Sequence, residues 1–276
     1  MIVDFCAYLG NWPPYQLPVG NATGLIRVMD RCGIGASFVS LVDGTFLLNP
    51  QEANGRIADL VAGHQDRLLP VGTVDVGSPC WRADVADGID RLNLAGFRLH
   101  PMVQGYALDG ESTLALAQVL AEHQRPLFVA SFIDEERFHH PAIHVPPVPL
   151  AHILGLVRHA PQTTIVLNNL TVEEAVMLLE EPGLSLDNVF LDVNAMDKPF
   201  NGLAQLIEHH GSERLVYGSQ VPFLYPEATL ALVGESSIPE GEGTAILEQN
   251  WRTNQTLHSL VESAERNQGL GSEPGF

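Results

Sequence analysis

Arg98 and His100 lie two residues apart in the stretch Gly96–Pro101, and their types could do chemistry together. Arginine carries a permanent positive charge on a planar fork that suits a carboxylate or a phosphate. Histidine ordinarily titrates near neutral pH and can donate or accept a proton. Residues two apart in a strand point the same way. We therefore expect Arg98 to hold a small anion and His100 to act as an acid or base beside it.

The alternative is a structural role for the same arginine. A buried charge needs a partner whether or not it takes part in chemistry. Asp4 and Asp192 each lie in an apolar stretch that would bury them. An inert polar core, with Arg98 paired to one of these carboxylates, would explain the same residues, and the sequence leaves both hypotheses open.

The first residues add a possible polar wall to this site. Ile2–Gly10 reads as a short buried strand that ends in a loop rich in glycine and proline. Side chains alternate between the two faces of a strand, so Asp4, Cys6 and Tyr8 would share one face. The apolar residues between them would pack on helices. The polar face is the one that could line a binding site.

Three more observations concern individual side chains of this wall. Asn169 and Gln220 follow later apolar runs and could complete a set of hydrogen-bonding groups around a ligand. Cys6 could be a nucleophile beside His100. However, a buried cysteine usually behaves as a small hydrophobic residue, and reactivity needs a lowered pKa.

The segment Asp134–His144 contains a second cluster of polar residues. We interpret it as a lid loop in which Arg137 and His140 cover the site, bind ligand or hold a subunit contact. A relocated metal site is the alternative, because the segment contains Asp134, His139, His140 and His144. Their spacing is less regular than that of known metal sites.

The elements that must position these residues alternate regularly along the chain. Short apolar runs typical of strands recur, at 2–8, 36–41, 68–74, 96–100, 126–131, 164–169, 188–193 and 214–219. Stretches of helical period lie between them, and Thr171-x-x-Glu174 is a capping box that starts one of them. This pattern predicts an α/β fold, a single-domain (β/α)8 TIM barrel over residues 1–266.

The ends of the chain complete the prediction. We expect a last helix around 244–264 to pack outside the barrel and residues 267–276 to form a disordered tail. An open doubly wound sheet is the rival architecture, and it would need a glycine-rich phosphate turn after the first strand. The sequence at 10–14, Gly-Asn-Trp-Pro-Pro, is not that turn.

Composition limits the partners and the compartment. The formal net charge of −19 over 276 residues makes nucleic acid an unfavourable partner. We see no apolar run that could span a bilayer and no secretory signal, so we expect no membrane partner. The three widely spaced cysteines argue against a disulfide framework, and we expect a cytoplasmic protein.

Several motifs, in order, resemble one known family. Asp4-x-Cys6-x-Tyr8-x-Gly10 resembles its first strand, Asp-x-His-x-His-x-Gly; the stretch 96–101 is similar to its Gly-x-Lys-Leu-His-Pro; and 218–222 is similar to its Gly-Ser-Asp-x-Pro. Asn54, the stretch 65–68, and Ile246-Leu247 with Asn250 resemble further motifs. The family is that of the amidohydrolase-related (amidohydrolase 2 type) metal-dependent hydrolases, and the resemblance extends over nearly the whole chain.

The resemblance also implies that the metal centre of this family has been changed. Its ligand positions correspond here to Cys6, Tyr8, Ala130, Asn169 and Gln220. Neutral amides bind transition metals poorly, alanine has no donor atom, and Gln220 cannot replace the aspartate that acts as general base. We therefore expect neither a metal nor another cofactor, and the metal-dependent activation of water would be lost.

Two functional hypotheses follow. In the first, the chain is an amidohydrolase-like barrel that binds a small anionic molecule, such as a carboxylate, without catalysis, as a sensor or as the partner of an active paralogue. In the second, it is a metal-independent hydrolase, lyase or isomerase of a small carboxylate or lactone that uses Arg98 and His100. The sequence does not decide whether the protein is an enzyme. We expect a homodimer or a complex with a paralogue.

Overall fold

The strands are short runs of apolar residues bounded by turns, and they pair side by side around a closed ring. The computed structural model of the chain describes residues 1–47, 49–134 and 145–270. Its strands are β1 (Ile2–Leu9), β2 (Ile34–Leu41), β3 (Leu68–Thr73), β4 (Gly96–Leu99), β5 (Leu127–Ala130), β6 (Ile165–Asn168), β7 (Val189–Asp192) and β8 (Leu215–Val216). They form one eight-stranded parallel sheet in chain order.

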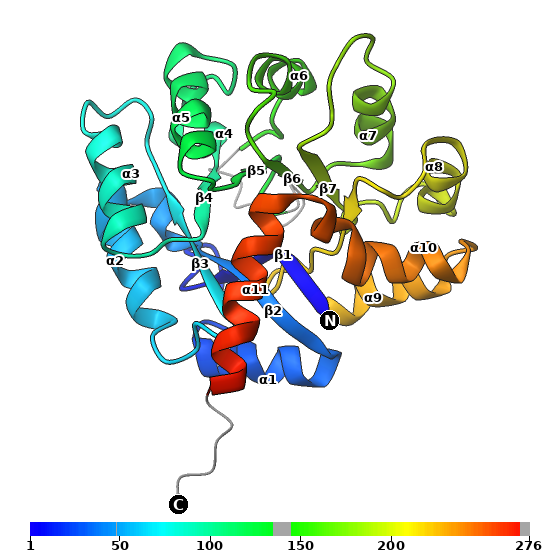
Figure 1. The fold of residues 1–276 in the computed structure, drawn as a ribbon, viewed down its shortest axis with the longest axis horizontal. Coiled ribbons are helices and arrows are strands. Elements are labelled where there is room, and N and C mark those ends of the chain that lie inside the picture. Colours follow the sequence, from blue (N-terminus) through cyan, green and yellow to red (C-terminus); the bar gives the residue numbers. More distant parts are fainter. Residues whose placement is uncertain (48, 135–144, 271–276) are drawn as a thin grey trace, which may run out of the picture.

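Backbone hydrogen bonds join the last strand to the first. The Phe5 N–H donates to the Tyr217 carbonyl oxygen at 3.0 Å, and the Tyr8 N–H donates to the Val221 carbonyl oxygen at 2.8 Å. Closure leaves the sheet without a free edge there. The predicted single-domain (β/α)8 barrel is thus confirmed (Figure 1).

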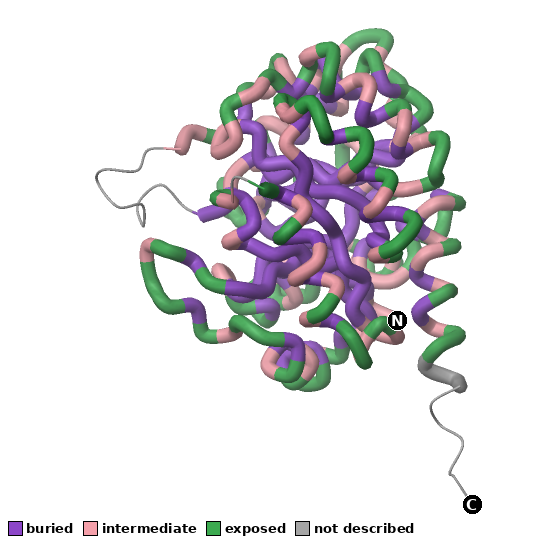
Figure 2. The backbone as a smooth tube through the Cα atoms, turned by 90° about the vertical axis from the view of Figure 1, so that its left-hand side faces the viewer, coloured by how far each residue is buried: buried purple, intermediate pink, exposed green. Residues whose placement is uncertain are grey.

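Helices follow the strands and cover the outside of the barrel. They are α1 (Ala22–Cys32), α2 (Pro50–Leu60), α3 (Trp81–Asp90), α4 (Pro101–Gln104), α5 (Glu111–Glu122), α6 (Leu150–His159), α7 (Val172–Leu179), α8 (Gly202–His210), α9 (Pro226–Glu235), α10 (Glu240–Thr244) and α11 (Gln255–Leu270). The capping box expected at Thr171 and Glu174 is present at the start of α7. Figure 2 shows the buried residues gathered in the strands and the exposed ones on the outer helices and loops.

Two apolar layers result from the alternation of strand residues. Residues such as Leu127 and Leu167 face outward and pack against the helices. Phe38, Phe128 and Phe190 belong to the layer inside the barrel. This inner layer fills the amino-terminal half of the barrel, so polar side chains are left to the carboxyl ends of the strands, where barrel active sites lie.

Helix α11 closes the amino-terminal end of the barrel (Figure 1). Its Leu257, Val261 and Ala264 belong to the inner apolar layer, together with the buried Trp251 that precedes it. The expected last helix therefore caps the barrel, and it begins later than predicted because a π-helix at Ala245–Gln249 and a 3-10 helix at Asn250–Thr253 precede it. It continues to Leu270. Residues 271–276 lie outside the described residues, so the tail remains a prediction.

Strand β1 does not alternate as the sequence suggested. Its pairing with β2 shifts register between Asp4 and Ala7, which is a bulge. Val3 and Phe5 consequently belong to the inner apolar layer, and Cys6 belongs to a separate buried cluster near Trp12 and Ile133. The expectation that Asp4 shares a face with Cys6 and Tyr8, and that Phe5 packs on helices, was wrong for this reason.

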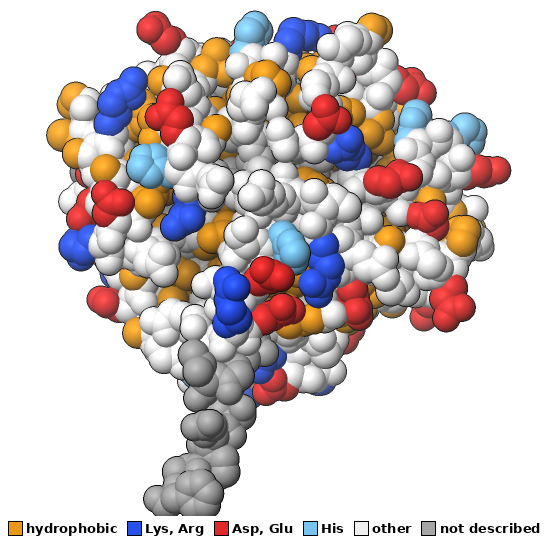
Figure 3. All heavy atoms as spheres, viewed as in Figure 1, with side chains coloured by type: hydrophobic (Ala, Val, Ile, Leu, Met, Phe, Trp, Pro, Cys, Tyr) orange, Lys and Arg blue, Asp and Glu red, His pale blue; other side chains and the backbone are white. Residues whose placement is uncertain are grey.

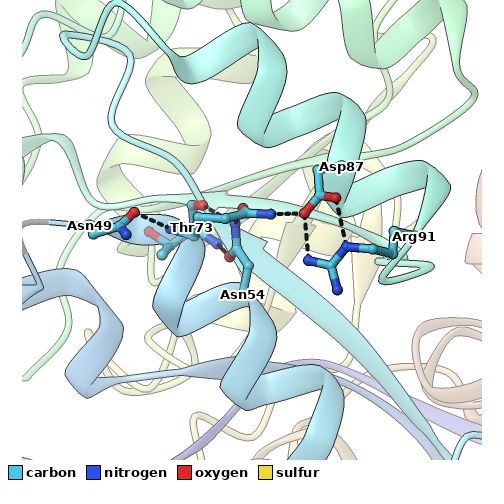
Figure 4. A network of polar contacts seen from close by, with 6 residues as sticks. Asn49, Asn54, Thr73, Asp87 and Arg91 are labelled. Atoms are coloured by element: carbon cyan, nitrogen blue, oxygen red, sulfur yellow. Dashed lines mark hydrogen bonds and ion pairs between the residues drawn. The ribbon is translucent and has the colours of Figure 1, made fainter.

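A polar network ties α2 and α3 to the end of β3 (Figure 4). The buried Asn54 side chain accepts from the Thr73 N–H at 2.8 Å and donates to the Thr73 carbonyl oxygen at 3.0 Å. Gln51 links Asn54 to Asp87, which forms an ion pair with Arg91 at 2.7 Å. Asn54 thus satisfies both backbone groups of Thr73, which lies beyond Val71, the last residue of β3 that pairs with β2.

The described helices give no candidate for a membrane span, since none of them is both long enough and apolar enough.

Candidate functional site

Arg98 lies at the centre of the barrel and is fully buried. Its two terminal nitrogens donate to the carbonyl oxygens of Phe5 at 2.9 Å and Ala7 at 3.1 Å. The guanidinium carbon lies 4.8 Å from the ring centroid of Tyr8 and 5.1 Å from that of Phe128. Arg98 therefore satisfies the carbonyl groups that the β1 bulge turns inward, and aromatic rings surround its charge.

The buried carboxylates near Arg98 are held mainly by other groups. Asp192 accepts from the Asn168 side chain at 2.7 Å and from the Asn169 N–H at 3.0 Å. Burial raises the pKa of Asp192 to about 6, while these hydrogen bonds and the charge of Arg98 lower it. The positive charge of Arg98 thus stabilises the Asp192 carboxylate electrostatically. The structural hypothesis had expected a direct ion pair between the two side chains.

His100 is 2% exposed and contacts Tyr8, with 3.3 Å between His100 Nε2 and the Tyr8 hydroxyl oxygen. Burial and the neighbouring charge of Arg98 lower the pKa of His100 to about 3. The imidazole is therefore neutral near pH 7. Our expectation that His100 titrates near neutrality overlooked both effects, and its neutral ring serves as a hydrogen-bond partner of Tyr8.

Cys6 and Asp4 also have roles within the protein. The Cys6 sulfur lies 3.8 Å from Asn169 Oδ1, and burial raises the pKa of the Cys6 thiol well above its usual range. The thiol stays protonated, which disfavours a nucleophile. Asp4 accepts from the Cys6 N–H at 3.0 Å and from the Ser219 hydroxyl at 2.6 Å and N–H at 2.9 Å. Asp4 therefore locks β1 to the residues after β8.

Asn169 directly follows β6, and Gln220 lies after β8. Both residues have left-handed backbone conformations, with φ of 66° and 54°. The Asn169 amide nitrogen donates to the Phe132 carbonyl oxygen at 2.6 Å, and the Gln220 amide nitrogen donates to the Ile133 carbonyl oxygen at 2.7 Å. Both side chains bind the segment that follows β5. The structure thus brings Asn169, Cys6, Tyr8, Arg98 and His100 together, as expected, but as a packed wall.

These residues do not fit a metal ion. The Asn169 oxygen accepts from the Asn194 side chain at 2.8 Å, and Ala130 offers no donor atom. Within the described part of the chain, no group of three histidine, cysteine, aspartate or glutamate side chains could hold a metal. Arg137, His139, His140 and His144 lie outside the described residues, so the lid and the relocated metal site remain predictions.

An open pocket lies beside this wall, over the carboxyl ends of β5 to β8. Its volume is about 620 Å³, which is typical of small-molecule sites. Its described lining residues are Phe132, Asp134, Val145, Pro147, Thr171, Glu173, Asn194, Ala195, Asp197, Lys198, Gln220, Leu224, Ala228, Thr229 and Leu232. Gln220 is the only one of the predicted binding residues among them, so the wall reaches the pocket at that point.

Most of this pocket could not be found from motifs. Glu173 follows β6, whereas Asn194 and Lys198 follow β7, and the three residues have no recognisable spacing. One signal was available: Lys198 is the only lysine of the chain, and it comes shortly after β7. The Tyr8 ring, in contrast, is covered by Phe223, whose centroid is 5.7 Å from it, and Phe223 is covered by Trp12, at 5.2 Å.

Comparison with solved structures identifies the same architecture elsewhere. The 2,6-dihydroxybenzoate decarboxylase from Rhizobium superposes with a TM-score of 0.70 at 14% identity, covering 94% of this chain and 98% of that one. The 5-carboxyvanillate decarboxylase from Novosphingobium aromaticivorans, solved with bound manganese, gives 0.71 at 16%, covering 94% and 97%. A putative amidohydrolase from Staphylococcus aureus gives 0.70 at 15%, covering 95% and 99%. At these identities the likeness concerns the fold.

Sequence comparison assigns the family. No curated protein matches the sequence significantly. The family model described as amidohydrolase matches residues 45–250, which is well over half of the chain. The matched range includes the strands from β3 to β8 and the residues that line the pocket. The chain therefore belongs to the amidohydrolase family.

Proposed function

We propose that this chain is a metal-independent member of the amidohydrolase family that binds a small carboxylate-bearing molecule and does not catalyse metal-dependent hydrolysis. One observation carries the proposal: the side chains at the metal-ligand positions of the family are either without donor atoms or engaged with one another and with backbone carbonyls. A metal would have to break these bonds. Cys6 alone would be a good zinc ligand, and the phenol and neutral amide groups would bind a metal poorly.

The pocket over β5 to β8 is the proposed ligand site. Lys198 is the one cation among its described lining residues, which also include the acidic residues Asp134, Glu173 and Asp197. We therefore place the carboxylate of the ligand at Lys198. One structural neighbour, a 2,6-dihydroxybenzoate decarboxylase, was solved in complex with the carboxylate 2,6-dihydroxybenzoate, which supports this ligand class.

Catalysis by Arg98 and His100 is the less favoured alternative. Both side chains would have to reach a substrate, yet Arg98 is 0% and His100 is 2% exposed. The pKa of His100, lowered by burial to about 3, also makes it a weak base. We propose that Asp4, Cys6, Tyr8, Arg98 and Asn169 support the pocket from behind and that Gln220 meets the ligand.

We also propose a cytoplasmic homodimer, or a complex with a paralogue. All three cysteines, including the buried Cys6, are unpaired, which fits a reducing compartment. Phe200 and Tyr225 are 96% and 75% exposed, and such large apolar side chains often mark subunit contacts.

Calorimetric titration with 2,6-dihydroxybenzoate, together with elemental analysis of natively purified protein, tests the function. We expect saturable binding without stoichiometric zinc, manganese or iron. Lys198→Met should weaken binding about tenfold, and Lys198→Arg should largely preserve it, because one charge-assisted hydrogen bond is worth about 1.5–3 kcal/mol.

Two results would contradict the proposal. One metal ion per chain would refute metal independence. Binding that Lys198→Met leaves unchanged would refute the assigned carboxylate position. Arg214→Met serves as the matched control, since Arg214 contacts Asp187 on the surface and is not among the lining residues.

A further inference from the structure

A second pocket lies at the opposite end of the barrel, between α11 and the loops that lead into β3, β4 and β5. Its volume is about 390 Å³, enough for a small metabolite. Leu68, Leu69 and Pro70 of β3 and Leu260 of α11 form its apolar part. This is the end of the barrel that faces the viewer in Figure 1, where α11 crosses in front of the strands.

The charges of this pocket differ from those of the rest of the molecule. The chain has 33 acidic and 14 basic residues. The described lining of this pocket nevertheless contains Arg125 and Arg266 and includes no aspartate or glutamate. Acidic and basic side chains do appear nearby on the same face of the molecule (Figure 3). The net positive charge therefore belongs to the residues that line the pocket and not to the surface around it.

Arg125 is anchored so that part of its guanidinium remains available. Its Nε donates to the Leu94 carbonyl oxygen at 3.0 Å, and one terminal nitrogen donates to the Gln124 carbonyl oxygen at 3.5 Å. These bonds fix the side chain on the loop before β5 and leave the second terminal nitrogen for another acceptor. Arg266 is exposed and reaches the pocket from α11.

Neutral hydrogen-bonding groups add to the two arginines. Thr256, Ser259 and Ser263 line the pocket from α11, and their spacing of three and four residues puts them on one face of the helix. Asn93 and Gln124 line it from the loops before β4 and β5, both with positive φ, at 50° and 51°. Guanidinium, hydroxyl and amide donors thus come from several elements, an arrangement that suits the oxygens of a phosphate.

We propose that this pocket binds a small soluble molecule that carries a phosphate group. The site is separate from the carboxylate pocket over β5 to β8 and does not depend on the function proposed for it. A ligand there would connect α11, which caps the barrel, to the loops before β4 and β5. Binding should therefore stabilise the folded chain, and the stabilisation should keep rising with the logarithm of ligand concentration above the Kd.

Titration calorimetry and thermal unfolding with pyrophosphate, at fixed ionic strength and in a phosphate-free buffer, test the proposal. We expect saturable binding and a rise in melting temperature. Arg266→Gln should weaken binding by at least about fivefold, and Ser263→Asp, which introduces a carboxylate at an exposed helix position, should abolish it. Both variants should fold, since neither side chain is buried.

Arg252→Gln is the matched control. It removes the same charge from an exposed arginine that stacks on Trp251 and does not line the pocket. Its affinity for pyrophosphate should stay within about twofold of the wild type. No saturable binding up to about 10 mM, or equal losses in Arg252→Gln and Arg266→Gln, would overturn the site. Citrate binding as tightly as pyrophosphate would overturn the assignment of phosphate.

Discussion

Replacing Arg98 with methionine tests whether this arginine holds the barrel together. The change keeps an unbranched side chain of similar length but removes the charge and both hydrogen bonds to Phe5 and Ala7. Hydrogen bonds from a charged donor contribute about 1.5–3 kcal/mol each, and removing one member of a buried charge group costs about 3–5 kcal/mol. We expect Arg98→Met to lower the free energy of unfolding by about 3–5 kcal/mol at pH 7.

The pH dependence of this loss provides an internal check. The charge of Arg98 lowers the pKa of Asp192, against burial that raises it to about 6. Without Arg98 that pKa rises further, so the folded variant retains its proton on Asp192 to a higher pH, whereas the unfolded chain has already released it. The loss of stability should therefore be larger at pH 7 than at pH 5.

Urea unfolding at both pH values, followed by circular dichroism, measures the loss. Arg82→Met is the control, because Arg82 also lies over an aromatic ring, 4.2 Å from the Trp81 centroid, but at the surface. It should cost less than about 1 kcal/mol. If Arg98→Met is no more destabilising than Arg82→Met, the structural role assigned to Arg98 is wrong and a ligand-binding role gains support.

Two further predictions concern buried polar side chains. Asp192→Asn should flatten the pH dependence of stability between about pH 4 and 7. The raised pKa of Asp192, about 6, makes the wild type lose stability as pH rises through that range. Urea unfolding across the range measures this, and an unchanged slope would contradict it. Asn54→Leu should destabilise the chain by about 2–4 kcal/mol, because both backbone groups of Thr73 lose their partner. Thermal unfolding measures this, with Gln118→Leu as the control at an exposed site. Equal melting temperatures of the two variants would contradict the prediction.

The barrel could be predicted because the sequence pattern that indicates it is repeated along the whole chain. Each strand is marked by an apolar run and each helix by apolar residues at helical spacing, so an error in one element does not change the predicted fold. Thr171 and Glu174 even specify the start of α7 through a local capping box. Tyr8 and Arg98, two of the residues in the amidohydrolase-like motifs, have the same advantage, since they lie on strands of the barrel.

The state of the central side chains could not be predicted in the same way. Alternation along β1 fails at the bulge between Asp4 and Ala7, which depends on pairing with β2. The low pKa of His100 depends on burial and on Arg98, which sequence spacing does not measure. The pocket beside Lys198 is assembled from loops after four different strands, so no local pattern marks it.

The positions that resemble the metal ligands of the family also link separate parts of the barrel. The resemblance implies that those ligands come from the first, fifth, sixth and eighth strands. Here hydrogen bonds join the same regions: Asp4 holds Ser219 after β8, while Asn169 and Gln220 hold the segment after β5. Rebuilding a metal site at Asn169 and Gln220 would remove their links to the segment after β5. Under the proposed metal independence, these hydrogen bonds would take over the joining of the strand ends, beside the pocket over β5 to β8.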